Sequence, residues 1–173
     1  VMVEHGALSR RLAWLSRTYA VDWRDRASQA TQITFDPALI ELLLPLTHGA
    51  SVALPPPGRL APAAVLACAR RHAVTIMAFV PSTLAGFLDA AQGCDDLKLR
   101  VGCCGGEVLS ADLANRFVAE TGAQLFNVYG PTEAVIFGEI LTQRNKLAKL
   151  LPEFLGKSKR FWPNEERSDG EQI

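Results

Sequence analysis

The residues best suited to chemistry lie in the stretch 127–133, around the dipeptide Gly130-Pro131. Proline fixes φ and has no N–H, and glycine adopts backbone angles that other residues avoid, so this pair predicts a sharp turn. Around the turn, Tyr129 offers a flat face for a ring to stack on, Thr132 a hydroxyl for a phosphate oxygen, and Glu133 a hard oxygen ligand for Mg²⁺. Together these groups indicate a nucleoside triphosphate, although an ordinary polar surface turn gives the same pattern.

Two further stretches upstream carry residues of this kind. Asp36 precedes Pro37 at the start of an apolar run, which predicts a helix whose first free N–H groups are capped by the Asp36 carboxylate. The pair Gly105-Gly106 is followed by Glu107. Two glycines let a backbone come close to a flat ring or a sugar, or simply make a tight turn.

Size and composition favour one globular unit that binds small molecules. The chain has 173 residues, of which 49% are hydrophobic, and this is enough for one sizeable core. The formal net charge is zero and 21% of the residues are charged, so nothing in the charge balance favours nucleic acid. The longest apolar runs, 42–46 and 74–80, are too short to cross a bilayer. We expect a cytoplasmic protein with no membrane partner.

The cysteines and histidines show no pattern of a metal site or a nucleophile. The cysteines lack a Cys-x-x-Cys spacing, and two of them are adjacent, so we expect reduced thiols that pack in the core. We assign no catalysis to any histidine, since none has a nearby Ser or Cys in a recognisable nucleophile setting. These residues are Cys68, Cys94, Cys103, Cys104, His5, His48 and His72.

Hydrophobic periodicity along the chain alternates between strand and helix. We expect a short opening strand at residues 1–4, a loop over 22–32 that ends in a strand, and further strands at 50–54, 74–80, 97–104 and 124–126. Helices are expected at 5–20, from Pro37 to Gly49, and at 62–72, 81–92 and 111–120. This alternation predicts an α/β fold with a mostly parallel sheet flanked by helices. The turns at 78–81, 103–107 and 127–133 would then meet at the carboxyl edge of the sheet, where such folds bind ligands.

The three stretches agree in order and spacing with the adenylate-forming, AMP-binding enzyme family, and most closely resemble the amino-acid adenylation domains of nonribosomal peptide synthetases. The resemblance covers residues 1–139 and implies a fragment, a partial N-terminal subdomain of the adenylate-forming fold. It implies activation of an amino acid with ATP and Mg²⁺ to an aminoacyl-AMP. The aminoacyl group would then pass to the phosphopantetheine thiol of a carrier-protein domain.

The same resemblance implies a role for each matching residue. Thr132 and Glu133 would be catalytic, with Glu133 also the Mg²⁺ ligand, and Asp36 would pair with the α-amino group of the substrate. The nucleotide would lie against Gly105, Gly106, Glu107, Asn127, Tyr129 and Gly130. The amino acid would lie against Asp36, Pro37, Ile40, Ala78, Gly102, Cys104, Val128, Ile136 and Phe137. Apart from Asp36 this pocket is apolar, so a hydrophobic amino acid is expected.

The sequence also departs from the family. The Ser/Thr/Gly-rich phosphate loop, the Thr-Gly-Asp motif and the catalytic lysine do not appear, and neither Lys157 nor Lys159 stands in for that lysine. We therefore expect a partial adenylation domain at 1–140, a divergent and poorly ordered tail at 141–173, and no adenylation by the chain alone. Two alternatives stay open: a non-catalytic remnant or structural module, and a fragment of an acyl- or aryl-CoA ligase, against which Asp36 argues.

Overall fold

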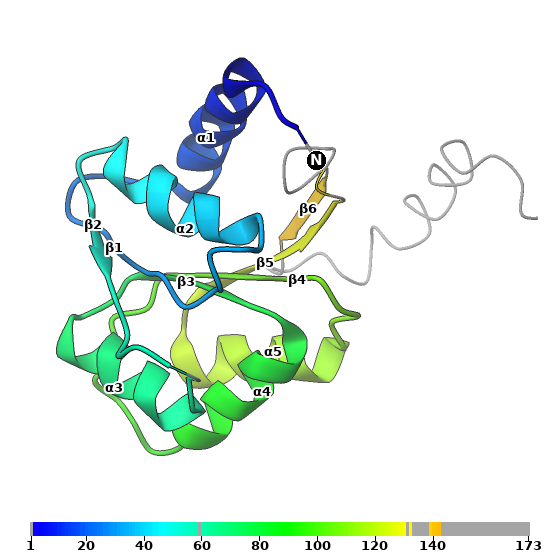
Figure 1. Cartoon of the computed structure of the whole chain (residues 1–173). Helices are drawn as coiled ribbons and strands as arrows, with labels where there is room; N and C mark the ends of the chain where they lie inside the picture. Colours follow the sequence, from blue (N-terminus) through cyan, green and yellow to red (C-terminus); the bar gives the residue numbers. More distant parts are fainter. Residues whose placement is uncertain (1, 59, 131, 133–138, 143–173) are drawn as a thin grey trace, which may run out of the picture. The chain divides into compact units, whose positions relative to one another are not determined.

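A six-stranded sheet lies between the helices of the described part of the chain (Figure 1). The computed structural model describes residues 2–58, 60–130, 132 and 139–142. The strand order is β2-β1-β3-β4-β5-β6; strands β1 to β5 are parallel, and β6 runs antiparallel to β5. The strands are β1 (Arg26–Ser28), β2 (Ser51–Ala53), β3 (Ile76–Phe79), β4 (Val101–Gly105), β5 (Gln124–Tyr129) and β6 (Glu139–Thr142).

Helices cover both faces of this sheet. Helices α1 and α2 lie on one face, and α3, α4 and α5 lie on the other (Figure 1). Each face has its own apolar core, so the sheet is buried on both sides as parallel sheets generally are. The helices are α1 (His5–Tyr19), α2 (Pro37–Leu46), α3 (Pro62–Arg71), α4 (Pro81–Ala90) and α5 (Ala111–Thr121). The predicted α/β fold is confirmed.

The ends of the helices follow local sequence signals. Proline occupies the first position of α2, α3 and α4, where its missing N–H has no partner to lose. The Ser110 hydroxyl accepts a hydrogen bond of 3.2 Å from the N–H of Leu113 and caps α5. That helix ends at Gly122, whose φ of 67° belongs to the left-handed region.

Four local predictions were wrong. Residues 2–4 form no strand, and the strand expected near the end of the loop over 22–32 is β1, placed earlier at Arg26–Ser28. Strand β5 runs on to Tyr129 instead of ending at Phe126. Asp36 does precede α2, but its backbone is already helical (φ −59°, ψ −32°) and its side chain makes no capping hydrogen bond. The carboxylate therefore does not have the role of helix cap that we predicted.

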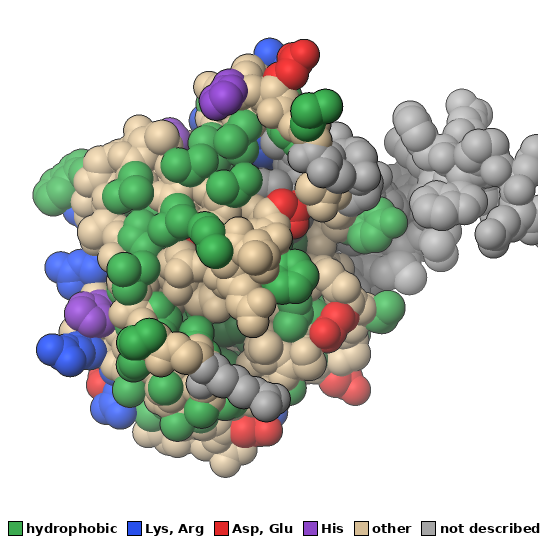
Figure 2. Space-filling model, in the orientation of Figure 1, with side chains coloured by type: hydrophobic (Ala, Val, Ile, Leu, Met, Phe, Trp, Pro, Cys, Tyr) green, Lys and Arg blue, Asp and Glu red, His purple; other side chains and the backbone are tan. Residues whose placement is uncertain are grey.

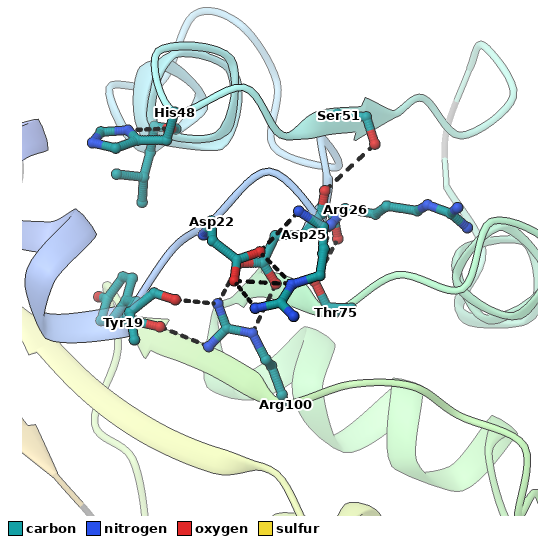
Figure 3. A network of polar contacts seen from close by, with 11 residues as sticks. Tyr19, Asp22, Asp25, Arg26, His48, Ser51, Thr75 and Arg100 are labelled. Atoms are coloured by element: carbon teal, nitrogen blue, oxygen red, sulfur yellow. Dashed lines mark hydrogen bonds and ion pairs between the residues drawn. The ribbon is translucent and has the colours of Figure 1, made fainter.

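Opposite the predicted site, a polar network ties the amino edge of the sheet together (Figure 3). The buried carboxylate of Asp25 forms an ion pair with Arg100, whose Nε lies 2.7 Å from Asp25 Oδ1, and accepts from Thr75 Oγ1, also at 2.7 Å. The guanidinium also donates to the backbone oxygens of Tyr19, at 2.6 Å, and Ala20, at 3.1 Å. Burial alone would raise the pKa of Asp25, but these hydrogen bonds outweigh it and hold that pKa below its ordinary value. The network joins the end of α1 to the starts of three strands.

Among the described residues, no helix has the length and apolar character needed to cross a membrane. Figure 2 shows hydrophobic side chains scattered over one face, with most charged side chains near its margins.

Candidate functional site

The carboxyl ends of β3, β4 and β5 lie side by side. Phe79 is paired with Cys104, and Gly105 with Val128, so the turns that follow these strands start from one edge of the sheet. The predicted common edge is confirmed for the described parts of those turns, 78–81, 103–107 and 127–130. Open α/β sheets bind ligands at such an edge.

The glycine turn after β4 lies in close contact with the end of β5. A Cβ atom on Gly105 would lie 2.4 Å from the backbone oxygen of Val128, so only glycine permits this close approach of β4 to β5. Gly106 has a φ of 83°, which favours glycine, and is exposed. The Glu107 carboxylate accepts from Ser82 N–H at 3.1 Å and Ser82 Oγ at 3.0 Å. Glu107 thus links this turn to the start of α4.

The end of β5 carries the residues predicted to bind the nucleotide. Asn127 and Tyr129 are two positions apart on the strand and therefore lie on the same face of it. Tyr129 is 66% exposed, which leaves its ring open for stacking. Gly130 is half-buried and Thr132 is exposed. The predicted Mg²⁺ ligand Glu133 lies outside the described residues.

A small cavity of about 30 Å³ lies between α2 and the sheet. Three residues predicted for the amino-acid pocket, Pro37, Ile40 and Ala78, line it. The remaining lining residues come from α1, α2 and strands β1, β3 and β4; they are Tyr19, Ala27, Ser28, Glu41, Leu44, Pro45, Ile76, Met77 and Cys103. Its walls are mainly apolar, with a few polar groups among them.

The structure does not bring two other predicted pocket residues to this cavity. Ala78 is paired with Cys103, and it is Cys103 that faces α1 and α2. Cys104 belongs to the core under α3, α4 and α5, and a Cβ atom on Gly102 would lie 2.5 Å from Cζ of Phe117 in α5. Gly102 and Cys104 therefore lie on the opposite face of the sheet from the cavity.

The other predicted pocket residues have different placements. Val128 packs in the core beneath α1 and α2, on the cavity's side of the sheet. Asp36 is half-buried at the start of α2. Phe35, 59% exposed, and Leu39, 39% exposed, stand close to it in the chain as apolar surface residues. Ile136 and Phe137 lie outside the described residues.

Sequence reasoning missed the polar groups of the cavity. Glu41 is only 5% exposed, and burial raises its pKa to about 7 although hydrogen bonds from Thr31 and Gln29 oppose this rise. Among the described residues, the buried hydroxyl of Ser28 has no hydrogen-bond partner, and the buried hydroxyl of Tyr19 lies against the thiol of Cys103. One signal could have found Glu41: it is the only charged residue of α2, one turn after Pro37 and between two apolar residues.

The thiols are placed as core groups. Cys68, Cys103 and Cys104 are buried, as predicted, and Cys94 is half-buried. Burial raises the pKa of both Cys103 and Cys104 to about 12, so neither provides a thiolate near neutral pH. Within the part of the chain that the structure describes, no three His, Cys, Asp or Glu residues cluster as metal ligands would.

Comparison with known proteins gives a consistent result. The sequence pattern of the family described as AMP-binding enzyme matches residues 1–157. Indigoidine synthase of Streptomyces lavendulae is 38% identical over 138 residues, which cover 79% of this chain and 11% of that protein. Enterobactin synthase component F of Escherichia coli is 36% identical over 157 residues, covering 83% of this chain and 12% of that protein.

A solved structure gives the same answer for the fold. The nonribosomal peptide synthetase FmoA3, in its alpha-methyl-L-serine-AMP bound form, superposes with a TM-score of 0.78 at 27% identity, covering 83% of this chain and 17% of that one. The chain therefore spans less than a fifth of the length of each of these relatives.

Proposed function

Because the chain belongs to the family of AMP-binding enzymes, we propose that it forms part of an amino-acid adenylation domain of a nonribosomal peptide synthetase. Residues 1–140 would be the adenylation part, and 141–173 a segment of different character. The whole domain would join the carboxylate of an amino acid to AMP and release pyrophosphate. The aminoacyl group would then be passed to the phosphopantetheine thiol of a carrier-protein domain.

The observation that carries this proposal is the meeting of Pro37, Ile40 and Ala78 at one cavity. These residues come from separate elements, α2 and β3, and the family resemblance assigns all three to the substrate side chain. The lining that they contribute is apolar, so we propose a hydrophobic amino acid as the substrate. Asp36, at the start of α2, would pair with the α-amino group.

Residues at the carboxyl edge of the sheet, here called the rim, have side chains suited to binding a nucleotide. The exposed ring of Tyr129 can stack on adenine, and Asn127 shares its face of β5. Thr132 is exposed, and in the proposal its hydroxyl donates to a phosphate oxygen. In the proposal ATP lies along this rim, and Mg²⁺, held by Glu133, neutralises its phosphate charge. The chain's residues would contribute mainly by holding the two substrates in a fixed orientation.

The test is amino-acid-dependent exchange of pyrophosphate into ATP by the longest natural protein that carries this segment. We expect exchange with hydrophobic amino acids and a loss of about 100-fold or more in Asp36→Ala, because the ammonium group then lacks its ion-pair partner. The matched control is Asp112→Asn, an exposed acid on α5, which should retain exchange. Exchange that depends on a fatty or aryl acid, and is unaffected by Asp36→Ala, would instead identify a CoA ligase.

A further inference from the structure

Glu41 holds a loop against α2 from a buried position. Its carboxylate faces back toward the segment that follows β1. Glu41 Oε2 accepts from the N–H of Thr31 at 3.0 Å, and Oε1 accepts from Thr31 Oγ1 at 2.9 Å. A longer contact of 3.5 Å reaches Nε2 of Gln29, which also donates to the backbone oxygen of Thr31. The loop is thus attached to the helix by one side chain.

This attachment closes a short loop that contains Asp36. Thr31 precedes Asp36 by five residues and Glu41 follows it by five. The two anchor points therefore lie on either side of Asp36 and Pro37, and fixing them restricts the path of the chain between them. Phe35 and Asp36 themselves gain backbone order from the turn in which Ala38 N–H donates to Phe35 oxygen at 3.1 Å. Asp36 thus lies between the Glu41–Thr31 contact on one side and the first turn of α2 on the other.

The surroundings of Glu41 make its charge sensitive to pH. Desolvation raises the pKa of this carboxyl to about 7, against the hydrogen bonds from Thr31 and Gln29. The titratable groups that face it from neighbouring elements are Tyr19 of α1 and Cys103 of β4. Burial raises the pKa of both, so both stay neutral near pH 7. Glu41 is then the member of this group whose charge changes around neutrality.

We propose that Glu41 is a positioning residue, whose ionised carboxylate holds the loop that sets the place of Asp36 and whose protonation weakens that hold. The contact between Glu41 and the loop is argued from the hydrogen bonds to Thr31. Only the role of Asp36 toward a substrate amine rests on the proposed function. Charge-assisted hydrogen bonds are about twice as strong as neutral ones, so the loop is held more firmly by the carboxylate than by the acid.

The effect on the whole fold has the opposite sign. A folded-state pKa raised above the unfolded value means that the folded protein binds the proton more tightly. Stability from this group is therefore fully present below about pH 4.5 and is lost as the pH rises through about 7. Raising the pH tightens the loop relative to an opened state in which Glu41 stays buried and loses only its Thr31 donors, since those donors lower its pKa. It weakens the fold relative to the unfolded chain, in which water hydrates the carboxylate.

The test is amide hydrogen exchange by NMR on the 173-residue chain between pH 5.5 and 8.5. We expect the protection factor of the Thr31 N–H to rise about tenfold with a midpoint near pH 7, in line with the gain from a charged acceptor. The amide signal of Asp36 should shift with the same midpoint. Glu41→Gln, which keeps the shape but cannot ionise, should abolish both changes, while Asp112→Asn should leave them intact.

Several outcomes would overturn the proposal. If the Thr31 protection factor is flat across the range, or titrates equally in Glu41→Gln, then the charge of Glu41 does not hold the loop. If the Asp36 signal does not share the midpoint of Thr31, then Glu41 does not position Asp36. Should Glu41→Gln fail to fold, the ¹³C shift of the Glu41 carboxyl in the unaltered chain decides: a midpoint below about pH 5 contradicts the proposal. None of these readouts needs an amino acid or a nucleotide, so a failure of the proposed function would not imitate them.

Discussion

The amino edge of the sheet, where its parallel strands begin, and the carboxyl edge, where they end, differ in how their polar side chains are buried and paired. At the amino edge, the buried Asp25 carboxylate is fully engaged by Arg100 and Thr75, and the end of α1 is tied into the same network (Figure 3). At the carboxyl edge, Val108 in the turn after β4 is 94% exposed, and Tyr129 at the end of β5 is 66% exposed. The polar network of the amino edge centres on a buried carboxylate, whereas the Glu107–Ser82 contact and the Tyr129 ring at the carboxyl edge are exposed.

This difference shows where the fold draws its stability and where it keeps groups available. Hydrogen bonds and charges that are already paired cannot bind a ligand without losing their partners. An edge that binds substrates must therefore leave polar groups and rings unpaired, and the fold gains its polar anchoring elsewhere. The comparison predicts a large stability loss from substitutions in the buried Asp25 network of the amino edge, and small losses from substitutions of exposed polar side chains, including those at the carboxyl edge.

The largest effect is expected from Arg100→Ala. The substitution leaves the Asp25 carboxylate, 5% exposed, without its cation, and the backbone oxygens of Tyr19 and Ala20 without a donor. Breaking a buried pair by removing one partner costs about 3–5 kcal/mol, and the partial exposure of Arg100 places this case near the lower end. Urea unfolding, monitored by circular dichroism, measures the change in the free energy of unfolding.

The matched control for this prediction is Arg24→Ala. Arg24 pairs with Asp22 at 2.6 Å, but the two side chains are 71% and 40% exposed. Water screens such exposed pairs, so Arg24→Ala should change the free energy of unfolding far less than Arg100→Ala. If Arg100→Ala cost no more than Arg24→Ala, the amino edge would not be the anchored one.

An intermediate effect is expected from Gly105→Ala at the carboxyl edge, where the cause is steric. The new Cβ would lie 2.4 Å from the backbone oxygen of Val128, and backbone cannot give way as a side chain can. Overpacking of this kind costs about 1–3 kcal/mol. The control is Gly6→Ala in α1, where the nearest atom is the mobile end of Arg10 at 3.4 Å; helix propensity makes that change stabilising by about 0.5–1 kcal/mol. If thermal unfolding gave the same change in stability for Gly105→Ala and Gly6→Ala, the close contact at Gly105 would be contradicted.

Much of the fold could be predicted because periodicity and helix-start signals are local. Proline at the first position of α2, α3 and α4, and the apolar run of β3, are visible without any tertiary information. Strand β1 was expected, but its position could not be found in this way. It has three residues, Arg-Ala-Ser, and no apolar run, since pairing with β2 and β3 defines it.

The sequence could predict that the site lies at the carboxyl edge of the sheet. It could not predict which side chains point to which face of the sheet. Which residues share a face depends on the register between β3 and β4, and a shift of one residue moves every side chain to the other face. The register pairs Ala78 with Cys103, so Cys103 reaches the cavity and Cys104 does not. The role of Glu41 was hidden for a similar reason, because its partner Thr31 lies ten residues away in a loop without a pattern.

The smallest effect is expected from Glu107→Ala, which removes the polar link of the carboxyl edge. Glu107 accepts from the N–H and the hydroxyl of Ser82 in the first turn of α4, where an anion also faces the positive end of the helix dipole. Both residues are exposed, so the lost contact should lower the free energy of unfolding by only about 0.5–1 kcal/mol. Glu107→Gln, which keeps an oxygen acceptor and loses the charge, should fall between the alanine variant and the unaltered chain in urea unfolding. A loss as large as that of Arg100→Ala would mean that the turn after β4 is itself an anchor of the fold, and the two edges would no longer differ in the way described.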